Sequence, residues 1–146
     1  MGAVEHATPV RHWKGTFTAD EAEVPLARHA ARAQLAGWGW DPDSDRVYDV
    51  LLILTELMTN VLRHASQPGA PVVVRLDETG GDCRVGVLDA RPDLPLPQTP
   101  VACGERGRGL LLVRHRADAT GVTTTATTKK VWASVRLTDD ALKDTL

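Results

Sequence analysis

The spacing of hydrophobic residues changes near residues 66–69, and this change constrains the fold more than any other feature. Before it, over residues 45–65, apolar side chains recur every three to four positions, as in a helix that buries one side. After it, residues 72–77 and 83–89 alternate with a period of two, which is typical of strands. A small chain with both periods predicts the α+β class, a two-layer sandwich with helices packed on one face of a mixed or antiparallel sheet.

Turn and cap residues give the bounds of the predicted elements. Residues 41–44, Asp-Pro-Asp-Ser, predict a turn and helix cap, and residues 78–81, Glu-Thr-Gly-Gly, predict a hairpin turn. The predicted order is a strand over 12–17, a helix over 21–35, a helix over 45–65, strands over 72–77 and 83–89, a helix over 108–117, and strands over 122–127 and 130–137.

An irregular stretch over residues 90–106 separates the two strand pairs. It holds Pro92, Pro95, Pro97 and Pro100, a spacing that neither a helix nor a strand ladder tolerates. Loops of this length in compact domains usually have a function. We therefore expect a mobile lid over residues 90–106.

Length and charge limit the classes of function. The 146 residues predict a single domain over 1–146, with its core at about 13–137. The 17 Lys and Arg residues against 19 Asp and Glu give a net charge of −2, so any charge-based recognition must be local. We accordingly expect no nucleic-acid partner, and interpret Arg114-His115-Arg116 as a solvated helix end. The lack of Cys-x-x-Cys pairs and of long apolar runs predicts a cytoplasmic protein with no membrane partner.

The helix predicted over residues 45–65 has a distinctive polar face. With Glu56 set at zero, Asn60 falls at about 40° and Arg63 at about −20°, opposite most of the apolar residues. Such a face is usually only the solvated side of a helix, but Asn is a poor helix former, and its carboxamide one turn from a carboxylate suits Mg²⁺. Leu52 and Ile53 also fall on this side, so we expect the first half of the helix to be covered on more than one side.

Four motifs together resemble those of one ATPase superfamily. Residues 56–65, Glu-Leu-Met-Thr-Asn-Val-Leu-Arg-His-Ala, resemble the N box shared by DNA gyrase, sensor histidine kinases, heat-shock chaperones and mismatch-repair proteins. Residues 85–89 resemble the strand ending in the adenine-binding Asp, residues 107–113 the glycine box, and residues 130–133 the final strand. Within the superfamily, the chain is most similar to the small anti-sigma-factor serine kinases and their actinobacterial relatives. This resemblance implies the histidine kinase-like, or Bergerat, fold.

The resemblance also implies roles for individual residues. Glu56 would be the catalytic residue that polarises the attacking hydroxyl or water, Asn60 would hold Mg²⁺ against the triphosphate, and Asp89 would accept a hydrogen bond from the adenine amino group. Glycines of the glycine box would let backbone N–H groups approach phosphate, whereas Arg108 either adds charge there or is a solvated arginine. The implied ligands are ATP and Mg²⁺, and the implied binding residues are Asn60, Arg63, Asp89, Gly107, Arg108, Gly109 and Leu110.

Two positions depart from the pattern of the relatives. Arg91 stands where many of them have a glycine two residues after the adenine-binding Asp, so the backbone beneath the base must differ. Lys130 stands where relatives often have a hydroxyl residue that assists the base, a role that Thr127 or Thr128 would have to take. Both departures point to weaker binding of ATP.

The implied function is that of a regulatory serine/threonine kinase. Such a kinase would transfer the γ-phosphate of ATP to a small anti-sigma antagonist and control a sigma factor, so that both proteins are expected partners. An alternative is a nucleotide-dependent protein-binding module with little or no kinase activity. The helix over 21–35 and the strand around Trp13 are the surfaces on which a homodimer is expected, if one forms.

Overall fold

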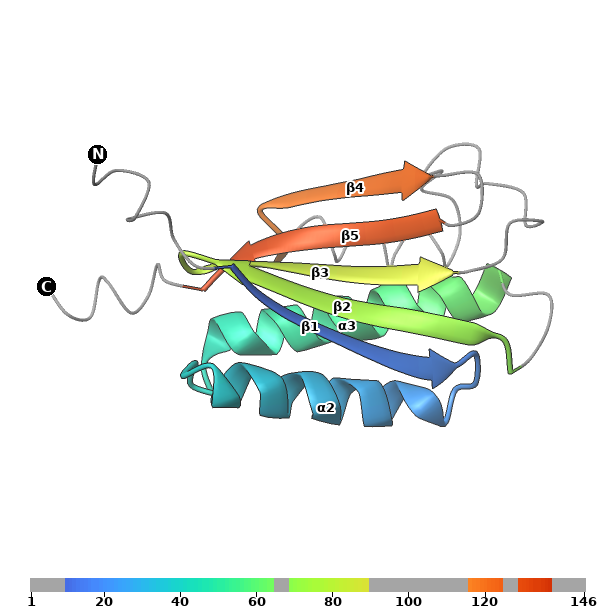
Figure 1. Cartoon of the computed structure of the whole chain (residues 1–146), viewed down its shortest axis with the longest axis horizontal. Coiled ribbons are helices and arrows are strands. Elements are labelled where there is room, and N and C mark those ends of the chain that lie inside the picture. Colours follow the sequence, from blue (N-terminus) through green and yellow to red (C-terminus); the bar gives the residue numbers. More distant parts are fainter. Residues whose placement is uncertain (1–9, 65–68, 90–115, 125–128, 138–146) are drawn as a thin grey trace, which may run out of the picture.

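The computed structural model of the chain describes residues 10–64, 69–89, 116–124 and 129–137. They form a five-stranded sheet with two helices lying together on one side of it (Figure 1). The elements are β1 (Val10–Thr18), α2 (Glu23–Gly37), α3 (Asp45–His64), β2 (Pro71–Thr79), β3 (Asp82–Asp89), β4 (Ala119–Thr124) and β5 (Lys129–Arg136).

The strands have the order β1-β2-β3-β5-β4, and every neighbouring pair is antiparallel. The predicted two-layer α+β sandwich is therefore confirmed, with an antiparallel sheet. We call the side of the sheet beneath α2 and α3 the inner face and the opposite side the outer face. The lid predicted over 90–106 lies outside the described residues, as does most of the helix predicted over 108–117.

The turn between β2 and β3 has the predicted chemistry. Gly80 and Gly81 both have positive φ, at 57° and 93°, and they join the paired residues Thr79 and Asp82. Two successive positive φ angles define the tight hairpin turn that suits twisted antiparallel strands. The side chain of Glu78 holds the turn by accepting a hydrogen bond from the Gly81 N–H at 3.0 Å.

Helix α2 packs through small residues. Ala27, Ala31 and Leu35 recur every four positions and are fully buried, so α2 approaches β1 and α3 closely along one narrow stripe. Its start is tied to the end of β1, because Glu23 accepts a hydrogen bond from the Thr18 N–H at 3.1 Å.

Helix α3 is the central element of the core and packs on β3 and β5. Ser44 caps its start by accepting a hydrogen bond from the Val47 N–H at 3.2 Å, as the sequence predicts. Ile53 is only 1% exposed although it lies on the polar side of the helix, which confirms that the first half of α3 is covered on more than one side. The apolar stripe of α3 that is buried comprises Val47, Val50, Leu51, Leu54, Leu57, Met58 and Val61.

Neither helix of the described part has the length and hydropathy that a membrane crossing requires.

Candidate functional site

Three of the predicted site residues lie in the C-terminal halves of α3 and β3. Glu56 and Asn60 are half-buried on α3, and Asp89 is the last residue of β3. Helix α3 packs on β3, and Figure 1 shows the C-terminal ends of both elements at the same end of the sandwich. The predicted catalytic, metal-binding and adenine-binding residues therefore lie in the C-terminal halves of two elements that pack on each other.

Asp89 lies on the inner face, where it is 6% exposed. In the sheet it pairs with Val72 of β2 and Lys129 of β5, so its backbone is fixed from both sides. A carboxylate is this deeply buried only where polar groups form hydrogen bonds or ion pairs with it. Asp89 lies at the end of a strand and faces the helix layer. It is therefore placed to accept a hydrogen bond from a ligand between the layers.

The polar face of α3 divides between two surroundings. Thr59 and Arg63 line a groove of about 580 Å³ between the end of α3 and the start of α2. Ala19, Glu21, Val24, Pro25 and Leu62 complete its lining. Glu56 and Asn60 do not contribute to this groove. Arg63, which is exposed, is therefore placed toward α2 and apart from the pair formed by Glu56 and Asn60.

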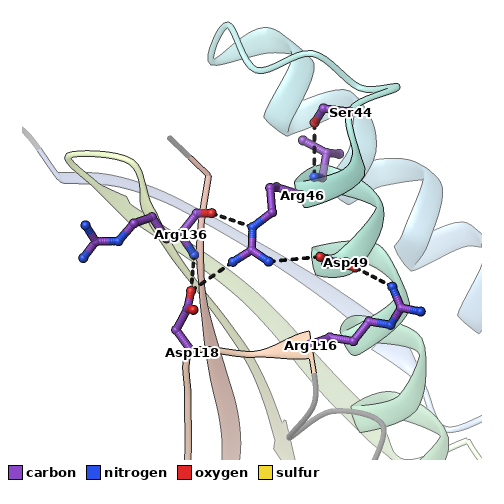
Figure 2. A network of polar contacts seen from close by, with 7 residues as sticks. Ser44, Arg46, Asp49, Arg116, Asp118 and Arg136 are labelled. Atoms are coloured by element: carbon purple, nitrogen blue, oxygen red, sulfur yellow. Dashed lines mark hydrogen bonds and ion pairs between the residues drawn. The ribbon is translucent and has the colours of Figure 1, made fainter. Parts of the chain in front are cut away.

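A buried aspartate two turns before Glu56 anchors α3 to the chain that follows residue 115. Asp49 is 8% exposed, and its two carboxylate oxygens accept hydrogen bonds from different arginines (Figure 2). Oδ1 accepts from Nη1 of Arg116 at 2.8 Å, and Oδ2 accepts from Nη1 of Arg46 at 3.1 Å. Arg116 is exposed, as expected of a solvated helix end, and it is also hydrogen-bonded to Asp49, whereas Arg114 and His115 lie outside the described residues.

Arg46 extends the same network to the sheet. Its Nη2 donates to Asp118 at 3.0 Å, and its Nε donates to the carbonyl oxygen of Arg136 at 2.8 Å (Figure 2). Asp118 also accepts from the backbone N–H of Arg136 at 2.7 Å. The start of α3, the residue before β4 and the end of β5 are thus joined by one set of hydrogen bonds.

Asp49 shares the helix face of Glu56 and Asn60. It falls about 20° from Glu56 around α3, because seven residues make close to two full turns. Asp89 ends β3 on the inner face of the sheet, and Arg116 is hydrogen-bonded to Asp49 on this face of α3. Local spacing missed Asp49, since its partner Arg116 is 67 residues away; its position on the same face as Glu56 was the one available signal.

The remaining predicted binding residues, Gly107, Arg108, Gly109 and Leu110, lie outside the described residues, as does Arg91. Lys130 is described and lies on the outer face, where it pairs with Leu88. Its side chain is therefore on the opposite side of the sheet from Asp89. The β5 residue that pairs with Asp89 is Lys129.

The oxygen ligands present suit a magnesium ion that arrives with a nucleotide. Among the residues that the structure describes, no group of three or more His, Cys, Asp or Glu side chains converges. The described part of the chain therefore has no site in which protein side chains alone would surround a metal ion. Mg²⁺ commonly takes only one or two protein oxygens and completes its shell with water and phosphate. The carboxamide of Asn60, one turn from the Glu56 carboxylate, fits that pattern.

Comparison with known proteins places these observations in a family. The sequence model described as "Histidine kinase-like ATPase domain" matches residues 17–135. An uncharacterized protein of Streptomyces coelicolor is 42% identical over 72 residues, which cover 47% of this chain and 68% of that protein. The crystal structure of the RsbU and RsbW domains of Rv1364c from Mycobacterium tuberculosis superposes with a TM-score of 0.63 at 20% sequence identity. That match covers 89% of this chain but 33% of the other, so the chain spans about one third of the solved protein, and the likeness is one of fold.

Proposed function

Because the chain belongs to the histidine kinase-like ATPase domain family, we propose that it binds ATP with Mg²⁺ on the α3 face that carries Glu56 and Asn60. One observation carries the proposal: Arg116 is hydrogen-bonded to Asp49 on this same face, seven residues along α3 from Glu56. The glycine box, residues 107–113, ends three residues before Arg116 in the sequence.

Each binding residue has a task that its chemistry suits. Asn60 would hold Mg²⁺, which when bound neutralises the charge that develops on the phosphates. Asp89 would accept a hydrogen bond from the adenine amino group. The backbone N–H groups of Gly107 and Gly109 would bind phosphate oxygens at the start of a helix.

We further propose that the ATP is used to phosphorylate a protein serine or threonine. The acceptor hydroxyl oxygen attacks the γ-phosphorus, the hydroxyl proton passes to the Glu56 carboxylate, and the bond to the bridging oxygen breaks to release ADP. The resemblance to anti-sigma-factor kinases makes a small antagonist protein the acceptor and a sigma factor the regulated partner.

The alternative, a nucleotide-dependent binding module without transfer, is favoured by one contact. The hydrogen bond between Asp49 and Arg116 joins the end of the segment after Asp89 to α3, and through Arg46 to β4 and β5. Binding of a nucleotide could therefore change a partner surface with no chemical step. Phosphoryl transfer to a partner separates the two functions.

Titration calorimetry tests the ATP site directly. We expect wild-type chain to bind ATP more tightly with Mg²⁺ than without it, and Asn60→Ala to lose most of this metal dependence. Thr59→Ala is the matched control, because Thr59 precedes Asn60 on α3 but faces the groove toward α2. An unchanged metal dependence in Asn60→Ala would contradict the assigned role of Asn60. If neither the wild type nor a variant gave binding heat with ATP, the proposal itself would be contradicted.

Incubation with radiolabelled ATP and the small proteins encoded by neighbouring genes then tests transfer. Label on a serine or threonine of one of them supports the kinase. Binding heat together with nucleotide-dependent capture of the same protein, and no label, supports the binding module.

A further inference from the structure

The outer face of the sheet concentrates positive charge in a chain whose net charge is −2. No helix lies on this face in the part of the chain that the structure describes. By strand register, its cationic residues are Lys14, Arg75, Arg84, Lys130 and Arg136, and its carboxylates are Asp77 and Asp82. This excess of positive charge is local to one face. With a net charge of −2, only such a local patch can attract an oppositely charged partner.

Three of these cations belong to strand positions around Gly86 in the middle of β3. Arg75 is the direct partner of Gly86 on β2. The side chain of Lys130 extends over Gly86, so that a Cβ built there would lie 2.6 Å from Lys130 Cε and 3.6 Å from its Nζ. The guanidinium of Arg84 lies 3.9 Å from the ring centroid of Trp132, which is the partner of Gly86 on β5. We call Arg75, Arg84 and Lys130 the outer-face cluster.

The nearby carboxylates are already engaged. Asp77 binds His12 and accepts a hydrogen bond from Arg75 at 3.2 Å. Asp82 forms an ion pair with Arg136 at 3.3 Å. Within the described ranges, Arg84 and Lys130 therefore have no carboxylate partner.

Like charges held together in this way carry an electrostatic cost. Partial burial lowers the pKa of Lys130 below its ordinary value, and the charges of Arg75 and Arg84 lower it further, while Asp77 acts in the opposite direction. Anionic groups supplied from outside would remove this repulsion.

We propose that the outer-face cluster is a docking surface for an acidic segment of a partner protein. The cluster borders a shallow hollow of about 610 Å³, which has room for side chains of an extended segment. Three carboxylates also line this hollow, and the third, Asp118, is engaged by Arg46 and by the Arg136 N–H. Carboxylates on such a segment would pair with Arg84 and Lys130. The surface lies across the sheet from the proposed ATP site and does not depend on that site.

The structure favours an acidic polypeptide over two other occupants. Single-stranded nucleic acid binds sheet faces by stacking bases on aromatic rings, but Arg84 already covers one face of Trp132, and the ring edge rests on Gly121. A second copy related by two-fold symmetry would set cation against cation, because each subunit presents the same patch.

Fluorescence anisotropy with a labelled peptide of alternating Glu and Ser residues tests the surface. We expect the double variant Arg84→Gln/Lys130→Gln to weaken binding by about tenfold or more and to reduce its salt dependence. The matched control is Arg28→Gln/Arg32→Gln, which removes the same charge from α2, where Arg28 contacts Tyr48 and Arg32 pairs with Asp43. The control should weaken binding by less than about twofold.

A second variant changes the geometry and keeps every charge. In Gly86→Ala, the new methyl group must displace the Lys130 stem, so we expect several-fold weaker peptide binding with an unchanged melting temperature. Equal weakening by both double variants would overturn the proposal, because net charge alone would then explain binding. Tighter binding of a single-stranded oligonucleotide than of the peptide at the same salt, or a dimer in sedimentation that Lys130→Glu dissociates, would also overturn it.

Discussion

Glu56 and Asn60 occupy neighbouring positions on one helix face, yet they have different proposed tasks. Asn60 would act in binding Mg²⁺-ATP, and Glu56 would act in phosphoryl transfer. The carboxamide of Asn60 can coordinate an ion and donate or accept hydrogen bonds, but only the carboxylate of Glu56 can also take up a proton. Binding and transfer are therefore expected to fail in different variants. This separation makes the two proposed functions distinguishable at single residues.

The first prediction concerns Glu56→Gln. The substitution keeps the shape of the side chain but removes the proton acceptor, so ATP affinity should change little while phosphoryl transfer falls by about 10²–10⁴-fold. Calorimetry measures the affinity, and radiolabel on the partner measures the transfer. Glu21→Gln is the control, since Glu21 lines the groove toward α2 and should affect neither quantity. Transfer at the wild-type rate in Glu56→Gln would exclude the base role.

The second prediction concerns Cys83, which is fully buried on β3. Burial, with smaller contributions from Glu78 and Asp77, raises the pKa of its thiol from 9.0 to about 12. The folded chain therefore keeps the proton in a pH range in which the unfolded chain loses it. Stability should fall by about 1.4 kcal/mol for each pH unit above 9.0 until the folded thiol itself ionises.

Urea denaturation of wild type and Cys83→Ala at a series of pH values measures this effect. The variant loses some packing at every pH, but it has no thiol to ionise. The difference in unfolding free energy between the two proteins should therefore shrink as pH rises above 9.0. A difference that stays constant up to pH 11 would show that the thiol is not protected.

At the scale of elements, α3 is joined to β4 and β5 through Arg46 and to the chain after residue 115 through Asp49. The third prediction is that Asp49→Asn lowers the unfolding free energy by about 1–3 kcal/mol, because two arginines lose the charge of a buried partner. Asp43→Asn is the control: its ion pair with Arg32 is solvent-exposed and should contribute about 0–1 kcal/mol. Chemical denaturation measures both, and equal losses would mean that the Asp49 contacts contribute no more than a surface pair.

Periodicity and turn chemistry were sufficient to predict most elements of this chain. The expected helix over 45–65 is observed as Asp45–His64, and the turn at Gly80 and Gly81 joins the expected strands. These features depend on neighbours within a few positions. The placement of β5 between β3 and β4 depends on pairing between distant segments, for which local spacing carries no signal.

The same limit applies to the candidate site. Glu56 and Asn60 could be selected because they lie one turn apart on one helix, but the partners of Asp49 and the face of Lys130 are set by tertiary packing and strand register. The resemblance implies a base-assisting hydroxyl in relatives at the position of Lys130, whereas the register directs Lys130 to the outer face. Lys130, which departs from the pattern of the relatives, is therefore free to contribute to the outer-face cluster.

At the scale of the whole molecule, the sheet separates two proposed binding surfaces. Asp89 lies on the inner face, toward the helices, and the outer-face cluster lies on the other. If each surface binds its own ligand, a variant of one should leave ligand-induced stabilisation by the other intact.

The last prediction uses thermal unfolding to test this separation. A ligand that binds only the folded state stabilises it by about 2.7 kcal/mol at a concentration of 100 times Kd, which for a domain of this size raises Tm by about 8 °C. We expect Mg²⁺-ATP to give such a rise in wild type and in Arg84→Gln/Lys130→Gln, and a clearly smaller one in Asn60→Ala. Loss of the rise in the outer-face variant would show that the two faces are coupled through β3 and β5, whose residues contribute side chains to both. Retention of the full rise in Asn60→Ala would instead place the nucleotide away from α3, while the acidic-peptide proposal, which depends only on the outer face, would stand.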